Sequence, residues 1–546
     1  MDFSNGEQTI NGGNSELGSD LTSRDYSSFR ETDSEYNFEG NKTNEVSVNE
    51  SYKHEAYEMK PLVSKNKSVF PNRKQLSYRL FHLQFFIRSP FRSVMLSISD
   101  LIIFFLLLAL YGGLSYYYYG KAKSYFLAGF WMILSFITAN LTLYSTLIIF
   151  LTSSHHSILF RIFSSAWDKN LWVHKFNGWF TFCCSLIHFI ACVLNWSVSK
   201  KGFGGFKSVN NIIGLVCLVA LCALQLLPLI RKFNYELFYY SHVFSMIIYI
   251  VGLFFHHQKK AVLKVTIAGL ALYVFDVIYR LWSIFRYKSK IIASNSQNSS
   301  MCVLTIKKYN FSFQPGQWIK ICIPSVSRWQ FHPISICSKP NLISKNKITN
   351  HRDVFKVLIK DLGDWSKKVL QKVGDQSIGS KIYVEAPVGT FLYPVANYNY
   401  IILFGGGVGI APMISLLEAL YEEKENFPRI VKFFWILRNP EALSIFGQKL
   451  AKINKHPRFF ISCFVSTEET EIKNISHYND NFIVLDRPRV RTLCDGCRKD
   501  ALELKIPKIL VSGCGPKKLS FEFHQTCLDL SDKKVKFHFE KKITNF

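Results

Sequence analysis

Four histidines lie inside long apolar segments of the chain, and they form two pairs with the same spacing. His174 and His188 are 14 residues apart, and so are His242 and His256. Along an α-helix, 14 residues rise about 21 Å and complete nearly four turns, about 40° short of a whole number. Both imidazoles of a pair therefore lie on one face of the helix. Two such helices side by side would bring two imidazole pairs together, one above the other. Low-spin haem iron takes two axial imidazoles in this way, so the spacing predicts two stacked b-type haems.

Other interpretations of these histidines stay open. A histidine inside a membrane can be a hydrogen-bonded core residue or one step of a proton path, and a single histidine would favour that interpretation. Two pairs at one spacing favour haem ligation. His257 competes with His256 as a ligand, since one residue turns the ring by about 100°, but the equal spacing favours His256. His155 and His156 have no partner at this spacing and are left unassigned.

The apolar segments that carry the histidines belong to a set of six. Each is near the ~20 residues that a bilayer crossing requires. They lie at about 98–119, 126–151, 173–195, 211–230, 236–257 and 261–283. An even number of spans puts both termini on one side of the membrane. Lys and Arg number thirteen in the segments that we place inside and eight in the outer loops, which predicts cytosolic termini.

This orientation assigns the two histidine pairs to opposite sides of the membrane. The third and fifth spans both run outward. His174 and His242 would therefore hold the inner haem, and His188 and His256 would hold the outer haem.

The composition fits a membrane part joined to a soluble part. Hydrophobic residues make up 48% of the chain, yet the formal net charge is +27. Much of the basic excess lies beside apolar spans, where attraction to anionic lipid and to nucleotide phosphates explains it better than nucleic-acid binding does. Residues 1–75 are rich in Ser, Asn, Glu and Gly without an apolar period, and we expect a disordered cytosolic arm there.

After the last span the pattern changes twice. Short β-type runs such as 302–306 and 318–323 alternate with Pro and Gly turns, which predicts a β-barrel domain over 288–396. Apolar strands followed by helix-like segments then predict an α/β nucleotide-binding domain over 397–546. The six-span membrane domain would occupy 95–285.

A glycine-rich turn follows the first strand of the α/β domain. It contains Gly405, Gly406, Gly407, Gly409 and Pro412. Glycines let the backbone approach a pyrophosphate, which then rests against the N-terminus of the next helix. The turn departs from the G-x-G-x-x-G fingerprint, because its last position before Ala-Pro is Ile.

Taken together, these motifs resemble the ferric reductase and NADPH oxidase superfamily. The resemblance is carried by His174-Lys-Phe-Asn-Gly-Trp…His188, by Tyr239-Tyr-Ser-His242…His256 and by Phe331-His-Pro-Ile-Ser335, in the family's order. It covers about residues 95–546. It implies a multi-domain membrane protein in which a six-helix haem bundle precedes a ferredoxin-reductase-like FAD-binding β-barrel and α/β NADP-binding domain. The implied activity is electron transfer from NADPH through FAD and two haems.

The resemblance also assigns residues to the flavin. The Ser335 hydroxyl would lie near the reactive flavin nitrogen, where it can donate or accept a hydrogen bond. Lys360 falls where relatives often have an arginine facing the flavin pyrophosphate, and a lysine keeps the charge but loses the bidentate geometry. The flavin candidates are His332, Pro333, Ile334, Ser335, Lys360, Gly363, Gly389 and Thr390.

A second set is assigned to the nicotinamide nucleotide. The glycine turn resembles the G-x-G-x-x-P form of flavodoxin-reductase-like enzymes. Arg438 would contact the adenosine 2′-phosphate, which favours NADPH over NADH. Cys514, Gly515 and Pro516 would lie beside the nicotinamide, and the ring of Phe546 would stack on the flavin until nicotinamide displaces it. The catalytic candidates are Ser335, Cys514 and Phe546.

The electron acceptor is the open question. NADPH oxidases have a long, disulfide-braced outer loop before the sixth span, whereas here only residues 257–260 follow His256. We therefore favour a ferric or cupric chelate over dioxygen, with superoxide production as the alternative. A six-span transporter with a nucleotide-sensing tail would need neither the paired histidines nor the flavin motif, and a redox sensor would lack acceptor turnover. We expect the plasma membrane, with endosomal or vacuolar membranes as alternatives, and the sequence allows a homo-oligomer or a small membrane partner subunit.

Overall fold

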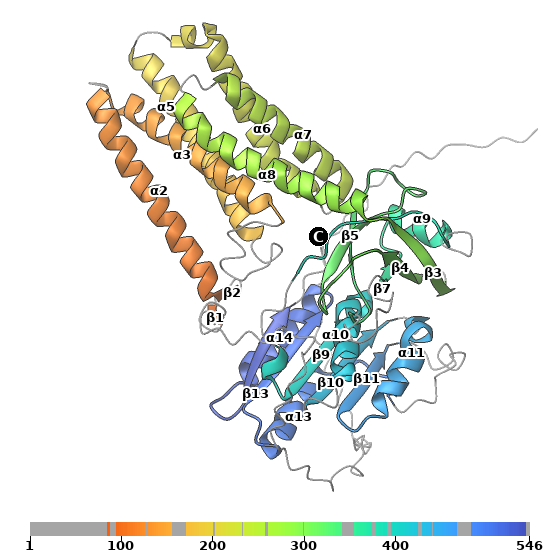
Figure 1. The fold of residues 1–546 in the computed structure, drawn as a ribbon. Helices are drawn as coiled ribbons and strands as arrows, with labels where there is room; N and C mark the ends of the chain where they lie inside the picture. Colours follow the sequence, from red (N-terminus) through yellow and green to blue (C-terminus); the bar gives the residue numbers. More distant parts are fainter. Residues whose placement is uncertain are drawn as a thin grey trace, which may run out of the picture. The chain divides into compact units, whose positions relative to one another are not determined.

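The protein is described as a computed structural model (Figure 1). The structure describes residues 84–87, 94–125, 129–155, 171–199, 202–231, 233–256, 260–298, 300–340, 354–372, 378–389, 395–423, 429–438, 441–466 and 482–541. The N-terminal arm predicted over 1–75 lies outside these residues. The predicted domain limits at 95–285, 288–396 and 397–546 stay predictions.

Six long apolar helices form the first half of the described chain. They are α2 (Ile98–Tyr125), α3 (Phe130–Ser153), α5 (Leu171–Val198), α6 (Val209–Ile230), α7 (Tyr235–His256) and α8 (Lys260–Arg286). All six are long and apolar enough to cross a membrane. A helix satisfies its own backbone hydrogen bonds, which is why apolar segments of this length cross bilayers as helices. Each of the six predicted spans overlaps one helix, and the predicted fold class is confirmed.

Polar side chains join the helices from within. Helix α3 contacts α2, α5 and α8, and α6 contacts α5 and α7. Between α3 and α5, the Ser145 hydroxyl lies 2.7 Å from the Thr181 hydroxyl, and Thr142 lies 3.3 Å from Ser185. In lipid there is no hydrophobic driving force between helices, so such hydrogen bonds, together with close packing, help to fix which face of a helix turns inward. They orient α5, which carries His174 and His188.

Two small antiparallel sheets follow the helices, and we refer to the domain that they form as the barrel. One has the order β3 (Ser289–Asn298), β4 (Met301–Lys308), β7 (Val354–Lys360); the other has the order β6 (His332–Ser335), β5 (Trp318–Cys322), β8 (Tyr383–Val384). Leu304, Ile319, Ile321 and Phe355, which come from both sheets, are buried in one core. The helix α9 (Asp364–Lys372) contacts β7.

The C-terminal domain is a parallel sheet of six strands. Their order is β12 (Ile483–Val484), β11 (Phe459–Val465), β10 (Ile430–Leu437), β9 (Tyr400–Gly406), β13 (Lys508–Cys514), β14 (Lys536–Lys541). Side chains on its two faces belong to two separate cores. The helices are α10 (Ala411–Glu422), α11 (Glu441–Asn454), α13 (Val490–Glu503) and α14 (Lys517–Leu530).

The strand order of this sheet reverses between β9 and β13. Strands β9 to β12 run outward in one direction, and β13 returns to the other side of β9. In open α/β sheets, ligands bind beyond the carboxyl ends of the strands at such a reversal. At this point lie the glycine turn after β9 and the segment after Cys514, so the topology alone brings the two predicted nucleotide motifs together.

We expect Gly513→Ala to destabilise the C-terminal domain. A Cβ at Gly513 would lie 2.1 Å from the Phe404 ring, which stacks on Phe523 at a centroid distance of 3.9 Å. Overpacking of this kind typically costs about 1–3 kcal/mol. The measurement is the midpoint of thermal unfolding. Gly496→Ala on α13, where a Cβ meets open space, is the matched control and should be neutral or stabilising by up to about 1 kcal/mol. Equal midpoints for the two variants would contradict the packing argument.

Candidate functional site

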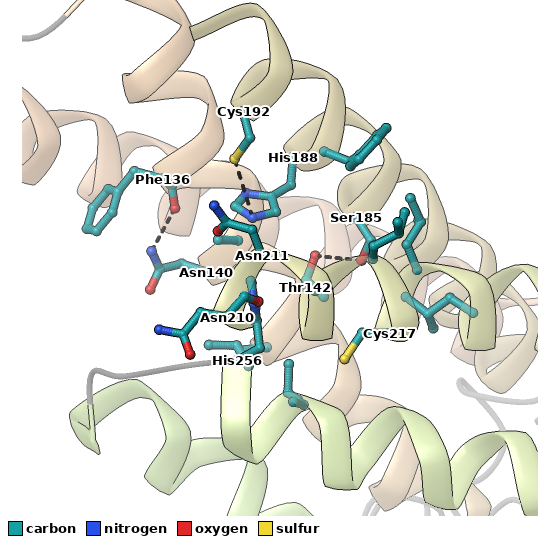
Figure 2. A pocket seen from close by; sticks show the side chains of 18 of the residues that line it. Phe136, Asn140, Thr142, Ser185, His188, Cys192, Asn210, Asn211, Cys217 and His256 are labelled. Carbon is teal, nitrogen blue, oxygen red and sulfur yellow. Dashed lines mark hydrogen bonds between the residues drawn. The ribbon is translucent and has the colours of Figure 1, made fainter. Parts of the chain in front are cut away.

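His188 and His256 face each other across a cavity inside the helical bundle (Figure 2). His188 lies on α5, and His256 is the last residue of α7. Their ring centroids are 6.3 Å apart and the ring planes meet at 79°. The cavity has a volume of about 870 Å³, within the range of cofactor sites. His257 lies outside the described residues, so the preference for His256 stays a prediction.

The hydrogen bonds of the two rings set their tautomers. His256 Nδ1 lies 2.7 Å from the carbonyl oxygen of Asn210, and His188 Nδ1 lies 2.9 Å from that of Ser135. A carbonyl oxygen can only accept, so each Nδ1 carries the hydrogen and each Nε2 keeps a lone pair. Among the described residues, the one hydrogen-bond contact of either Nε2 is the Cys192 thiol, a weak donor 3.8 Å from His188 Nε2 (Figure 2). Two imidazoles oriented in this way are suited to bind one metal ion through Nε2.

The cavity also has the shape and lining for a flat apolar group. A Cβ at Gly214 would lie 2.6 Å from the His256 ring, so only glycine leaves room for that ring. Aromatic side chains that line the cavity include Phe136, Phe189 and Trp196, and among the described lining residues Lys121 is the one cation. An apolar cavity with two imidazoles and one positive charge fits a haem, whose carboxylates need a polar or cationic partner.

The other pair, which the sequence predicts to be the inner one, is His174 on α5 and His242 on α7. The Ser153 hydroxyl donates to the carbonyl oxygen of Ile149 at 2.7 Å, so it accepts the hydrogen of His174 Nδ1 at 3.1 Å. His174 thus also keeps a lone pair on Nε2. Among the described residues, no hydrogen-bond partner meets the buried Nδ1 of His242. The two imidazoles lie close enough to interact electrostatically, and this pair fits a second haem.

The predicted flavin motif forms strand β6. His332 pairs with Ile321 and Ser335 with Trp318 of β5, so Pro333 and Ile334 lie in the same short strand. The His332 ring stacks on Trp365, with centroids 4.0 Å apart and planes at 24°. Burial lowers the pKa of His332 to about 4, so its ring is neutral at pH 7. In the described part of the chain, His332 Nε2 and Trp365 Nε1 are buried without hydrogen-bond partners, as polar groups beside a cofactor site can be.

Glycines shape the other edge of the flavin site. Gly389 has a φ of 100°, which side-chain-bearing residues rarely adopt, and its carbonyl oxygen accepts from Gln317 at 2.8 Å. A Cβ at Gly363 would meet open space. Thr390 and Phe546 lie outside the described residues, so their assignments stay predictions.

A second cleft lies at the strand reversal and holds most of the predicted nucleotide residues. Its volume is about 750 Å³. Its lining includes Lys360 from the barrel together with Gly406, Gly407, Gly409, Arg438, Gly515 and Pro516. Added Cβ atoms would lie 2.6 Å from Pro516 Cδ at Gly406 and 2.7 Å from the Cys514 carbonyl oxygen at Gly409. The two loops therefore approach so closely that only glycine fits.

Three predicted residues lie behind the cleft surface. A Cβ at Gly405 would lie 2.3 Å from Ile410 Cδ1, and Pro412 is buried in the first turn of α10. Cys514 is only 1% exposed, so its thiol packs in the sheet and its backbone shapes the cleft.

The sequence analysis missed four polar residues of this cleft: Ser466, Arg487, Lys518 and Glu522. With Lys360 and Arg438, the described part of the lining has four cations against one carboxylate, Glu522. Such an excess suits the phosphates of a dinucleotide. The basic residues around Arg487 and the Lys517-Lys518 pair after Pro516 were visible in the sequence, but nothing there indicated that they share one cleft.

Three family models match successive parts of the chain. Residues 138–253 match the ferric reductase like transmembrane component, 286–394 the FAD-binding domain and 398–528 the ferric reductase NAD binding domain. The chain belongs to the ferric reductase and NADPH oxidase superfamily. It therefore contains FAD-binding and NAD(P)-binding domains, and the membrane part of this superfamily carries haems.

Known members of the superfamily are distant from this chain. Ferric reduction oxidase 8, mitochondrial, of Arabidopsis thaliana is 26% identical over 302 residues, which are 53% of this chain and 40% of that protein. NADPH oxidase 1 of Mus musculus is 24% identical over 306 residues, 46% of this chain and 49% of its own length. NADPH oxidase 3 of Homo sapiens is 23% identical over 466 residues, 66% of this chain and 80% of its own length. The chain spans less than half the length of the first two relatives.

We expect Gly214→Ala to remove the outer haem and leave the inner one. The added Cβ would push the His256 ring away from the position opposite His188. The measurement is the haem-to-protein ratio by pyridine haemochrome, which should fall from about two to about one. Gly113→Ala on α2, where a Cβ meets open space, is the control and should keep the wild-type ratio. An unchanged ratio in Gly214→Ala would argue against this cavity as a haem site.

Proposed function

We propose that this protein is a transmembrane oxidoreductase that moves electrons from cytosolic NADPH through FAD and two b-type haems to a ferric or cupric chelate on the opposite side. The observation that carries the proposal is the geometry of the two imidazole pairs, which share one helix spacing and keep a lone pair on Nε2 of His188, His256 and His174. Membership of the superfamily supports the same order of redox centres.

Different parts of the chain would bind the nucleotide, the flavin and the haems. The cations of the cleft at the strand reversal hold the nucleotide phosphates, and the glycine loops let the dinucleotide approach the backbone. Strand β6 presents Ser335 and the neutral His332 to the flavin. The paired histidines would hold the iron of two haems at two levels of the bundle. When bound, FAD accepts a hydride from NADPH, and the haems carry single electrons.

The arrangement also constrains the final step. His188 and His256 would both ligate the same iron, so the acceptor would be reduced without itself binding to that iron. This step needs no acid or base from the protein. Helix α7 ends at His256 and α8 begins at Lys260. Such a short connection supports an accessible outer cavity, in which a bulky metal chelate can approach.

Superoxide production from dioxygen is the second candidate. The NADPH oxidases among the relatives support it, since one of them aligns over 80% of its own length. The same electron path would serve both reactions. The proposal also includes a plasma-membrane location with both termini in the cytosol.

We expect Arg438→Ala to raise KM for NADPH about tenfold to a hundredfold and to leave KM for NADH nearly unchanged. A charged hydrogen bond to the 2′-phosphate typically contributes about 1.5–3 kcal/mol, and every 1.4 kcal/mol is a factor of ten. Steady-state kinetics with both nucleotides measure this. Arg491→Ala changes an arginine that is outside the cleft lining and 70% exposed in its side chain, and it should resemble the wild type. Equal effects on both nucleotides would assign Arg438 another role.

The acceptor is tested by following ferric-chelate reduction and superoxide in parallel in membranes from overexpressing cells supplied with NADPH. We expect ferric reduction that persists with superoxide dismutase and disappears when His188 and His256 are both replaced by Ala. His456→Ala, in the turn before β11, controls for loss of a histidine outside the bundle and should retain activity. A signal that dismutase abolishes, with little direct iron reduction, would favour the oxidase.

A further inference from the structure

Charged side chains are buried where the helical bundle meets the flavin barrel. Glu385, directly after β8, is 4% exposed, and its Oε1 lies 3.0 Å from Arg280 Nη1 and 3.3 Å from His155 Nδ1. Arg280 on α8 also donates through Nε to Asp276 at 3.0 Å. Asp276 in turn accepts from the backbone N–H of His155 at 3.3 Å. One carboxylate of the barrel thus binds two residues of the bundle.

Lysines of the barrel complete this cluster. The Lys308 ammonium on β4 donates to the Val384 carbonyl oxygen and, at 3.4 Å, to the Ser283 carbonyl oxygen of α8. Lys320 on β5 is attracted to Glu385. Burial opposes ionisation of Glu385, but the hydrogen bond from His155 and the nearby charge of Lys320 outweigh it, so the pKa of Glu385 lies below its usual range. Removal of one member by substitution would leave its partners buried without their counter-charge, which is strongly unfavourable.

The cluster is connected to both redox sites. On the barrel side, β8 pairs with β5 and β5 pairs with β6, so Glu385 continues the sheet that carries the flavin motif. On the bundle side, His155 follows α3 two residues after Ser153, whose hydroxyl binds His174. The flavin strand and an inner haem ligand are therefore joined through a few directly bonded residues.

We propose that Glu385, Arg280, Asp276 and His155 are positioning residues that dock the flavin barrel against the inner histidine pair and so set the rate of electron transfer between them. The inference rests on the proposed function. In this step one electron leaves the reduced flavin and converts the inner iron from ferric to ferrous. Small changes in the placement of reacting groups change rates strongly, so a contact that fixes this placement controls the step without touching either cofactor.

The test uses Glu385→Gln in the full chain, loaded with FAD and haem, under anaerobic conditions. Stopped-flow spectroscopy follows haem reduction by NADPH, and a soluble dye that takes electrons directly from the flavin reports the earlier hydride step. We expect haem reduction to slow by at least about tenfold, with dye reduction unchanged. The matched control is Glu418→Gln, which removes the charge of a carboxylate that is 8% exposed, binds Lys449 at 2.6 Å and accepts from the backbone N–H of Lys339 at 3.1 Å. It should leave haem reduction at the wild-type rate.

The docking of the barrel against the helical bundle can be measured in protein that contains no cofactor. Hydrogen exchange in the apo protein should become faster in Glu385→Gln at residues 383–386 and at the end of α8, but not in Glu418→Gln. Wild-type haem reduction in Glu385→Gln, an equal loss of haem and dye reduction, or unchanged hydrogen exchange would each overturn the inference. If NADPH fails to reduce the haems of the wild-type protein, the proposed function fails, and the exchange experiment still decides whether the cluster docks the barrel.

Discussion

The membrane half of this protein depends on the hydrogen bond from each outer imidazole to a backbone carbonyl of a neighbouring helix. His188 of α5 binds Ser135 of α3, and His256 of α7 binds Asn210 of α6. Each bond fixes both the tautomer of a ring and the height of one helix against another. Four helices must therefore be in register before the two Nε2 atoms can face one cavity. The hydroxyl contacts between α3 and α5 also help to keep these helices in register, because they hold the inward face of α5 in place.

In the C-terminal domain, backbone geometry positions the residues of the nucleotide cleft. Its strand order reverses beside β9, and there the loops after β9 and β13 approach so closely that Gly406 and Gly409 admit no side chain. The space that remains is lined by cations from several segments. In both halves, a close approach between distant segments of the chain creates the site.

The helices of the membrane domain and the four histidines could be predicted, because both depend on the periodicity of the sequence over short stretches. Hydrophobic runs predicted the six helices, and a shared spacing of 14 residues selected His174, His188, His242 and His256. Contacts between segments that are far apart in the chain give no periodic pattern in the sequence. Arg487 and Lys518 were missed for this reason. His155 was left unassigned, since its partner Glu385 lies 230 residues further along the chain.

The tautomers of the outer pair have an electrical consequence. A backbone carbonyl can neither release nor take up a proton, so Nδ1 of His188 and of His256 keeps its hydrogen when the charge of a bound iron changes. An electron that crosses the bundle then moves as an uncompensated charge at this pair. Such a charge gains or loses about 2.3 kcal/mol per 100 mV of membrane potential. A negative cytosolic potential would drive outward transfer, and continuous turnover would depolarise the membrane unless cations followed by another route.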